Sequence, residues 1–483
     1  MTYSFNPEKS IFIDGQWQAG TDTRPNINPS DISENLGNFS SGTAQQVEEA
    51  IAAARNAQPS WEAVPMEQKQ AILQKIGDEL IARCEELGKI LALEEGKTFP
   101  EGKGEVYRSG QFFHYYAAEV LRQMGDFANS TRPGVTVEVT REAVGVVGVI
   151  TPWNFPTAIG AWKIAPAIAF GNTVVWKPAD LTPASAVALM EIMHKCGVPN
   201  GVVNLVLGRG SVVGDAIINS PKINAVSFTG SLAVGKQIAS ATAQNLVKCQ
   251  MEMGSKNALY VAPDADMTTA VESALMGSYS GTGQKCTASS RLVVDAKIHD
   301  EFVDALTKRL GEIKVGHAME EGAFMGPVVD EKQLNSNLEW VEKAKASGAE
   351  CVIGGNRLDM PTEGYYMAPT LFTNTTNDMD INCEEVFAPL ACVIKVSDTD
   401  EAINVVNDTM FGLTAGIVTN DLKLSTEFKR RAEVGCVMVN LPTAGTDYHV
   451  PFGGRKASSF GPREQGSYAK EFYTVVKTGY QKA

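Results

Sequence analysis

The sequence lacks long apolar segments. No run of apolar residues approaches the roughly 18 residues that a membrane-spanning helix requires. The first residues, MTYSFNPEKSIFIDGQW, contain neither the basic region nor the apolar region of a secretory signal. We therefore expect a cytoplasmic protein that does not enter a membrane.

An excess of basic residues is also lacking. Lys and Arg number 42 against 56 Asp and Glu, which gives a formal net charge of -14. Nucleic acids and anionic membrane surfaces are bound by basic patches, so we expect neither as a partner. If the substrate is an anion, it must be captured by a local cation.

Cysteine pairs are absent as well. The eight cysteines form no C-x-x-C pair and no His-x-His or Cys-x-His grouping lies near them. This scatter is typical of reduced thiols, and we expect neither a disulfide framework nor a metal site. Because free cysteine is usually a small buried side chain, a catalytic role for any one of them needs separate support.

The pattern of the chain predicts an α/β protein. Residues 43 to about 124 have helical periodicity, and GVTVEV then reads as a strand. Short β-branched runs alternate with helical stretches up to LVKCQMEMG, with one helix starting at Ser211, and a second alternating set extends to about Asn440. This alternation indicates two parallel-sheet lobes that meet near residue 255, with a ligand cleft between them.

Two motifs suit a dinucleotide. FTGSLAVG follows a predicted strand, and its Gly230, Ser231 and Gly235 could form a pyrophosphate turn at a helix N-terminus, or an ordinary strand-helix turn. VVWKPAD places Lys177 and Asp180 at the end of another strand, where they could hold ribose hydroxyls or remain solvated surface charges.

Three residues could carry chemistry. Asn154 in TPWNFP could donate its amide to an oxyanion or simply occupy a proline-rich turn. Glu252 in CQMEMGSKN is surrounded by methionines that would raise its pKa, which suits a general base. Cys286 in GTGQKC lies on a glycine-rich loop that could present its sulfur, and the neighbouring Lys285 could favour the thiolate.

Several motifs in this order resemble the aldehyde dehydrogenase superfamily. They are TPWNFP, GNTVVWKPAD, FTGSLAVG, MEMGSKN, GTGQKC, EEVFAPL and PFGGRKASSFG, and the resemblance extends from IFIDGQW near the start to VVKTGY near the end. It implies an NAD(P)-binding domain over 1–125 and 144–254 and a catalytic domain over 255–453. A small β oligomerisation element would comprise 126–143 and 454–483, and would make the protein a homodimer or homotetramer.

The resemblance also implies roles for individual residues. Cys286 matches the nucleophile, Glu252 the general base and Asn154 the oxyanion amide of a thioester mechanism that releases a carboxylic acid. The residues expected at the cofactor are Trp153, Lys177, Ala179, Asp180, Gly210, Gly230, Ser231, Gly235, Glu385 and Phe387. Those expected at the substrate are Arg108, Phe155, Trp162, Lys285, Thr287 and Phe452.

One position departs from the family pattern. Ser255 stands where a second glycine is usual after the base, so serine would be strained there if the position required positive φ.

Asp180 matches an acidic residue that tends to accept from the adenosine ribose and to repel a 2'-phosphate. We therefore expect NAD as the first choice of cofactor, with NADP tolerated because aspartate is shorter than glutamate.

The substrate is expected to be an acidic aldehyde. NLPTAGTDYHVPFGGRKASSFGPREQG and GQKCTASSR are similar to the branch that oxidises 2-oxoglutarate semialdehyde, also named 2,5-dioxopentanoate. Succinate semialdehyde and sulfonated aldehydes are alternatives. Arg108 would bind the remote anionic group, or form a surface ion pair with Glu101 or Glu105.

Two other classes of function also remain open. One is a non-catalytic structural or binding member of the fold. The other is a cysteine hydrolase, which would need no cofactor.

Overall fold

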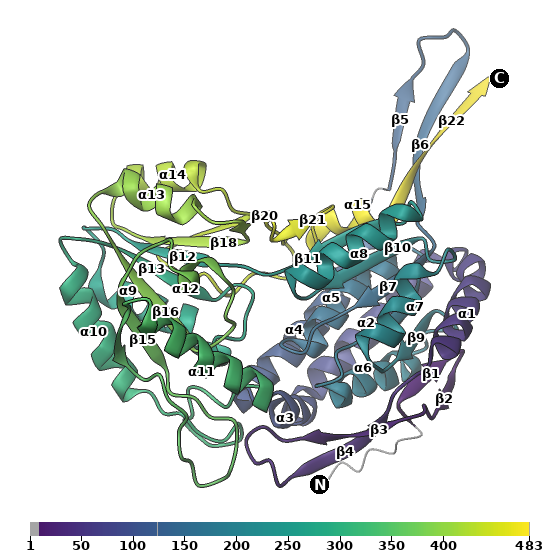
Figure 1. Cartoon of the computed structure of the whole chain (residues 1–483). Helices are drawn as coiled ribbons and strands as arrows, with labels where there is room; N and C mark the ends of the chain where they lie inside the picture. The colour runs from purple at the N-terminus through teal and green to yellow at the C-terminus, as the bar shows by residue number, and fades with distance from the viewer. Residues whose placement is uncertain (1–8, 123, 483) are drawn as a thin grey trace.

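The structure is a computed structural model that describes residues 9–122 and 124–482. Two lobes, each built on a largely parallel β-sheet, lie side by side, and a three-stranded sheet projects from one of them (Figure 1). The first lobe contains the eight-stranded sheet and helices α1 to α8, and the second contains the seven-stranded sheet and helices α9 to α14. The predicted α/β class with parallel sheets is confirmed.

The sheet of the first lobe has the order β2-β1-β9-β8-β7-β10-β11-β21. Its strands are β1 (Ile11–Ile13), β2 (Gln16–Gln18), β7 (Val146–Ile150), β8 (Thr173–Lys177), β9 (Val203–Val206), β10 (Ala225–Thr229), β11 (Lys248–Glu252) and β21 (Ser459–Phe460). From β9 to β11 all pairings are parallel. The strand order changes direction between β7 and β10, because β8 and β9 follow β7 on one side and β11 follows β10 on the other. A ligand crevice is therefore expected at the carboxyl ends of β7 and β10.

Helices cover this sheet as the sequence predicts. They are α1 (Ala44–Glu62), α2 (Met66–Ala82), α3 (Cys84–Glu95), α4 (Phe99–Glu119), α5 (Pro156–Ala169), α6 (Pro183–Lys195), α7 (Asp215–Asn219) and α8 (Leu232–Gln244). Helix α5 is buried along almost its whole length, which explains its continuous apolar sequence. Helix α4 packs on α2, α3 and α5 and so reaches the region next to β7.

The sheet of the second lobe has the order β14-β15-β16-β13-β12-β18-β19. Its strands are β12 (Asn257–Val261), β13 (Ser289–Asp295), β14 (Glu350–Ile353), β15 (Thr370–Thr375), β16 (Leu390–Val396), β18 (Thr414–Val418) and β19 (Cys436–Val439). Its helices are α9 (Met267–Ser278), α10 (His299–Glu312), α11 (Glu331–Ala346), α12 (Asp380–Cys383), α13 (Thr399–Asn407) and α14 (Leu422–Arg431). Only β14 pairs antiparallel in this sheet.

The projecting sheet joins distant parts of the chain. The hairpin of β5 (Asp126–Asn129) and β6 (Val135–Ala143) pairs with β22 (Thr474–Lys482), which follows β6 along its full length. Most of β22 is exposed. The domain boundaries expected from the sequence stay a proposal, which the separation of the two lobe sheets and the projecting sheet supports.

Two segments differ from expectation. The helix predicted from Ser211 begins as a π-helix over Gly210–Gly214 before α7, because glycines and β-branched valines are poor helix formers. The C-terminal segment 454–483 does not lie wholly in the projecting sheet. Its first part forms β20 (Arg455–Lys456) and β21, and β21 pairs with β11 beside Glu252.

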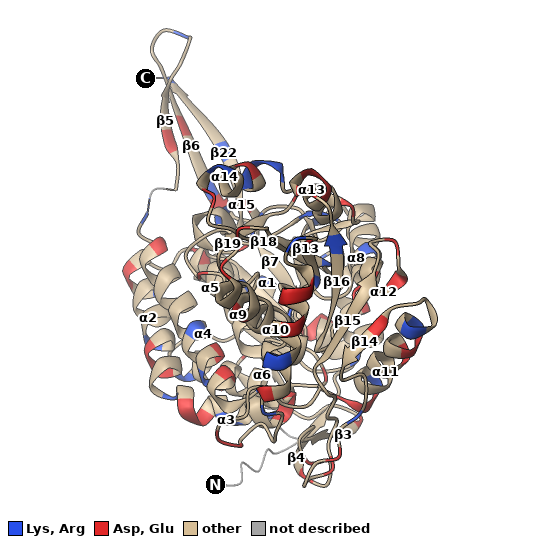
Figure 2. Ribbon diagram, turned by 90° about the vertical axis from the view of Figure 1, so that its left-hand side faces the viewer, with Lys and Arg blue, Asp and Glu red and all other residues tan. Residues whose placement is uncertain are grey.

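Charged residues are spread over the helices of both lobes, with Lys and Arg interspersed among Asp and Glu (Figure 2). None of the helices within residues 9–122 and 124–482 is both long enough and apolar enough to cross a membrane.

A second hairpin, β3 (Thr23–Ile27) and β4 (Asn35–Ser40), is anchored to the first lobe by a buried carboxylate. Asn26 donates to Glu94 Oε2 at 2.9 Å. The backbone N–H groups of Ala184 and Ser185 in the first turn of α6 donate to the same carboxylate at 2.9 and 2.8 Å. Glu94 therefore caps α6 and fixes the hairpin, although burial raises its pKa to about 7.

This arrangement predicts that Glu94→Ala lowers the thermal stability of the protein. The substitution leaves buried N–H groups without an acceptor, which costs about 2 kcal/mol. Glu191→Ala on α6, the helix that Glu94 caps, removes only an exposed ion pair with Lys9 and serves as the control. Equal shifts of the apparent Tm in the two variants would contradict the capping role.

Candidate functional site

The loop that carries Cys286 has an unusual backbone. Gly281, Thr282 and Gly283 have φ of 60°, 55° and 65°, so three successive residues are left-handed before the cysteine. A side chain at Gly283 would place its Cβ 2.1 Å from the carbonyl oxygen of Ala388. The loop therefore packs directly on the segment that follows Phe387, and only glycine permits this approach.

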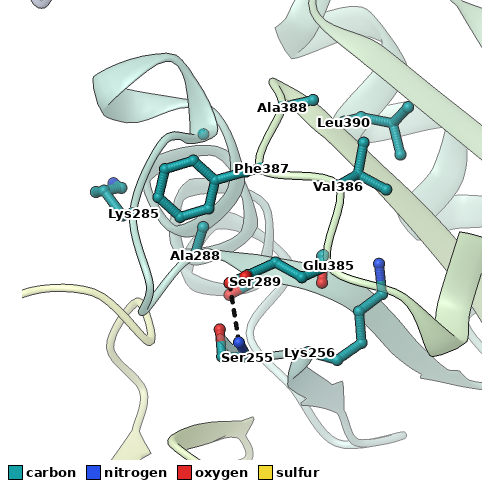
Figure 3. Close-up of a pocket in the computed structure, with 12 residues that line it drawn as sticks. Ser255, Lys256, Lys285, Ala288, Ser289, Glu385, Val386, Phe387, Ala388 and Leu390 are labelled. Carbon is teal, nitrogen blue, oxygen red and sulfur yellow. Dashed lines mark hydrogen bonds between the residues drawn. The ribbon is translucent and has the colours of Figure 1, made fainter. Parts of the chain in front are cut away.

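Ser255 connects three elements of the site. Its hydroxyl donates to the carbonyl oxygen of Cys286, and its backbone N–H donates to Glu385 Oε1 at 2.9 Å (Figure 3). Asn257 also donates to the Cys286 carbonyl, at 2.8 Å. The strain considered for a serine at this position is not found, because Ser255 is not among the described residues with positive φ. The serine instead ties the end of the β11 segment to the cysteine loop.

The Cys286 thiol has a raised pKa in this arrangement. Burial is the main cause, and the carboxylates of Glu385 and Glu252 add to it. The ammonium of Lys285 donates to the Ser280 hydroxyl and to the carbonyl oxygen of Met276, and its attraction for the Cys286 sulfur does not outweigh the effect of burial. The expectation that Lys285 favours the thiolate stays a prediction. Burial also lowers the pKa of Lys285 to about 8.

Asn154 is held by a buried network. Its side-chain Nδ2 donates to the carbonyl oxygen of Gln284 at 3.0 Å, and its backbone carbonyl oxygen accepts from Lys97 Nζ at 2.6 Å. Lys97 pairs with Glu105 at 2.7 Å. The other oxygen of Glu105 accepts from the backbone N–H groups of Thr157 and Ala158 at 3.0 Å. An amide nitrogen has two N–H groups, so one remains for a ligand next to the cysteine loop.

Glu252 ends β11 and is 3% exposed. Its Oε2 accepts from the Ser459 hydroxyl at 2.6 Å. Burial raises its pKa well above the usual value, and the nearby carboxylate of Glu464 raises it further. Glu464 is itself paired with Lys163, and both side chains are buried. The carboxylate of Glu252 also raises the pKa of the Cys286 thiol. The end of β11 in the first lobe therefore lies near the cysteine loop of the second.

The turn after β10 suits a phosphate group. Ser231 is the N-cap of α8, but its side chain makes no capping hydrogen bond, so the first N–H groups of the helix have no such acceptor. A Cβ at Gly230 would lie 2.6 Å from the ring of Phe228, and one at Gly235 would lie 2.4 Å from Met253 Sδ. Glycine therefore allows the backbone to turn closely over the end of the strand.

The turn after β8 contains Lys177, Ala179 and Asp180. Lys177 Nζ donates to the carbonyl oxygen of Pro178 at 2.8 Å and lies 3.7 Å from Asp180 Oδ1. That Oδ1 is buried and has no hydrogen-bond partner among the residues that the structure describes. Gly210 begins the π-helix after the neighbouring strand β9 and is exposed. These residues lie at the carboxyl ends of adjacent strands.

Aromatic and acidic groups come together at the second lobe's edge of the site. Trp153 and Phe387 pack edge to face with ring centroids 5.5 Å apart. Phe387 has φ of 63°, a strained backbone that is common at functional sites. Burial raises the pKa of Glu385 to about 7. Figure 3 shows Glu385, Phe387 and Lys285 lining one pocket with Ser255.

Another aromatic group surrounds Trp162. Its ring lies 5.8 Å from that of Phe112 and 5.7 Å from that of Phe452, and its Nε1 is buried without a partner in the described part of the chain. Phe112 also packs on Tyr448, at 6.4 Å. We call Phe112, Trp162, Tyr448 and Phe452 the aromatic cluster. Phe155 packs instead on Lys97, whose Nζ lies 4.0 Å from its ring centroid.

Arg108 on α4 lies over the aromatic cluster, with its guanidinium carbon 5.5 Å from the ring centroid of Tyr448. The surface ion pair considered as its alternative role is not found. Glu105 pairs with Lys97, and Glu101 accepts from Thr98 and the Gly281 N–H. Within residues 9–122 and 124–482, no carboxylate pairs with Arg108, which leaves a half-buried cation free for a ligand.

The remaining substrate residues expected from the sequence are not brought together with the aromatic cluster by any contact that we observe. Lys285 lies with Glu385 and Phe387, and the carbonyl of Thr287 accepts from the Thr443 hydroxyl at 2.7 Å. Tyr448, Ser459, Glu464 and Lys163 were not singled out from the sequence. They reach the site through long-range contacts, and a short local pattern contains no signal for them.

Comparison with known proteins is consistent with this geometry. The model of the aldehyde dehydrogenase family matches residues 17–479. An alpha-ketoglutaric semialdehyde dehydrogenase of Bacillus subtilis (strain 168) is 41% identical over 476 residues, covering 98% of this chain and 97% of that protein. A 2,5-dioxopentanoate dehydrogenase of Saccharolobus solfataricus is 42% identical over 458 residues, covering 94% and 95%.

Solved structures agree. A betaine aldehyde dehydrogenase from Staphylococcus aureus, crystallised in complex with NAD+, matches with a TM-score of 0.95 at 34% identity, covering 98% of this chain and 95% of that one. The chain therefore belongs to the aldehyde dehydrogenase family. It is an NAD(P)-dependent aldehyde dehydrogenase, so the resemblance in the sequence is confirmed and the non-catalytic alternative is set aside.

The contacts of Ser255 predict that Ser255→Ala lowers kcat about fivefold, because the cysteine loop loses a hydrogen bond worth ~1 kcal/mol. Steady-state assays of aldehyde oxidation measure this effect. Ser290→Ala, which removes a hydroxyl from the same pocket, should have little effect and is the control. The role given to Ser255 would be wrong if both variants kept the wild-type kcat.

Proposed function

We propose that this enzyme oxidises an acidic semialdehyde, 2-oxoglutarate semialdehyde being the first candidate, to the carboxylic acid through a thioester on Cys286. The observations that support the proposal are the hydrogen bond that joins Asn154 to the Cys286 loop and the charge interaction of Cys286 with Glu252 of the other lobe. Arg108 adds a half-buried cation on α4 that lies over Tyr448. The names of the two relatives at 41% and 42% identity support the same substrate.

The residues present fit a nicotinamide dinucleotide. The uncapped start of α8 after Gly230 suits a pyrophosphate, and the unpartnered Oδ1 of Asp180 suits a ribose hydroxyl. Lys177 and Glu385 would hold the two riboses, and Trp153 and Phe387 would flank the nicotinamide. When bound, the nicotinamide supplies a hydride acceptor. NAD is the expected cofactor, with NADP tolerated.

Cys286 and Asn154 perform the first half of the reaction. The Cys286 thiol first loses its proton to solvent. The sulfur then forms a bond to the aldehyde carbon, and the carbonyl electron pair moves to the oxygen. The second N–H of the Asn154 amide and the backbone N–H of Cys286 stabilise this oxyanion. Loss of hydride with its electron pair restores the carbonyl and leaves an acyl group on the sulfur as a thioester.

Glu252 performs the second half. Its carboxylate takes a proton from water as the water oxygen bonds to the thioester carbon, and the carbon-sulfur bond then breaks. The acid leaves and the thiolate is regenerated. The hydrogen bond from Ser459 holds one carboxylate oxygen and leaves Oε1 for water. A cysteine hydrolase would use the same sulfur but would leave the dinucleotide residues without a function.

Arg108 would choose the substrate. A guanidinium can bind a carboxylate through two parallel hydrogen bonds, and the guanidinium of Arg108 lies over the Tyr448 ring. An uncharged aldehyde would gain nothing from this cation. Succinate semialdehyde and sulfonated aldehydes also have a remote anion, so a series of acids of increasing length with one sulfonate would identify the preferred substrate.

The projecting sheet supports a proposal about assembly. Phe127, Val476 and Tyr480 on β5 and β22 are 70%, 57% and 63% exposed. Isolated apolar residues at this level of exposure on an edge strand favour pairing with another copy of the chain. We therefore propose a homodimer or homotetramer. The cytoplasmic location also stays a prediction.

Substitutions of the catalytic residues test the mechanism. Cys286→Ala should abolish turnover, because no other group in the scheme forms the thioester. Glu252→Gln should release about one equivalent of reduced cofactor per site in a burst, followed by slow turnover, because deacylation has lost its base. Stopped-flow absorbance measures both. Full steady-state activity of the Cys286→Ala protein would refute the scheme.

The raised pKa of Glu252 predicts a pH dependence of deacylation. Below that pKa the carboxyl group is protonated and cannot accept a proton from water, so the rate should rise with pH over a range that lies well above the ordinary glutamate pKa. Single-turnover deacylation of the acylated enzyme measures the profile. A rise centred near the ordinary glutamate value of about 4.3 would contradict the assigned burial effect.

Arg108→Met should weaken the use of acidic aldehydes selectively. Loss of the guanidinium should lower kcat/KM about 30-fold for 2-oxoglutarate semialdehyde, or ~2 kcal/mol. An uncharged aldehyde of similar length is the control and should change little. Arg108→Lys, which keeps the charge but not the planar geometry, should be intermediate. Equal losses on both aldehydes would remove Arg108 from substrate recognition.

A further inference from the structure

Arg24 lies beside the turn that contains Asp180, although it is distant in the sequence. Its Nη1 is 3.9 Å from Asp180 Oδ2, and the two side chains are 40% and 28% exposed. On the other side of the carboxylate, Lys177 Nζ lies 3.7 Å from Oδ1. Two cations therefore face one carboxylate at the place where we propose the adenosine ribose to bind.

The position of Arg24 is fixed by the hairpin that carries it. Arg24 and Asn26 are two residues apart on β3, so their side chains lie on the same face of the strand. Asn26 donates to the buried Glu94, which also caps α6 directly after the Asp180 turn. The hairpin and the turn are thus held to a common anchor, and the guanidinium is kept next to Asp180.

The contact between Arg24 and Asp180 is easily redirected. At 3.9 Å it is an ion pair without a hydrogen bond, so the guanidinium donors are not consumed by the carboxylate. Ion pairs that are exposed to solvent contribute little to stability. A stronger anion at this place can therefore recruit Arg24 at small cost.

We propose that Arg24 and Lys177 form a subsite for the 2'-phosphate of NADP, so that Arg24 determines cofactor specificity. The inference rests on the proposed function, which places the adenosine ribose at Lys177 and Asp180. Without Arg24, the carboxylate of Asp180 would repel a dianionic phosphate. With it, the carboxylate is neutralised and the phosphate gains a planar donor that suits two of its oxygens. NAD, which has a hydroxyl there, would use Asp180 and not require Arg24.

Binding of small nucleotides isolates this subsite. Isothermal titration would compare 5'-AMP with 2',5'-ADP, and NAD with NADP, on the full-length enzyme without aldehyde. In Arg24→Gln, the Kd of 2',5'-ADP and of NADP should rise about tenfold, because a charge-assisted hydrogen bond to the phosphate is lost. The Kd of 5'-AMP and of NAD should stay within about twofold.

Two further variants complete the design. Arg24→Lys keeps the positive charge and should recover part of the affinity for 2',5'-ADP. Arg55→Gln removes an exposed arginine of α1 that hydrogen-bonds to the carbonyl of Lys222, and controls for the change in net charge. Arg55→Gln should leave the Kd of all four ligands unchanged.

The outcomes separate the two proposals. If wild-type enzyme binds NAD but Arg24→Gln changes the Kd of 5'-AMP and the Kd of 2',5'-ADP by the same factor, or changes neither, the subsite is refuted and the proposed function stands. The subsite is refuted in the same way if wild-type enzyme binds NAD but not NADP. If wild-type enzyme binds neither dinucleotide, the proposed function itself fails.

Discussion

The buried ion pair between Lys97 and Glu105 is the interaction on which the site depends. It lies where α4, the loop after β7 and the start of α5 meet, and each partner also binds backbone groups of that loop or helix. Removing Lys97 would leave the buried carboxylates of Glu105 and Glu95 without their cation, which is far more costly than losing a surface pair. The amide of Asn154 and the face of α4 that presents Arg108 are therefore positioned together. The oxyanion donor and the proposed substrate cation share one support.

The rest of the site is assembled across the boundary between two sheets. Glu252 ends the last parallel strand of the first lobe, and Cys286 precedes β13 in the second. Ser255 joins them, because its hydroxyl holds the cysteine loop and its backbone N–H holds Glu385. A glycine at this position could make only the second of these contacts. The departure from the family pattern is thus an added connection between nucleophile, base and ribose carboxylate.

The fold and the central residues could be predicted because their signals are local. β-branched runs followed by helical periodicity specify parallel strands, and Asn154, Lys177, Gly230 and Glu252 lie at or directly after strand ends. The side chains that complete the site have no such pattern. Arg24, Tyr448, Ser459 and Glu464 are placed by hairpins and loops that return to the site from distant parts of the chain. Side-chain direction was equally hidden, as Lys285 demonstrates by donating to the Ser280 hydroxyl.

The raised pKa of the Cys286 thiol has a consequence for the reactivity of the enzyme. Peroxides and electrophiles attack the thiolate far faster than the thiol, so burial and two nearby carboxylates should slow such attack on the resting enzyme. We therefore expect oxidants to inactivate the enzyme faster during turnover than at rest.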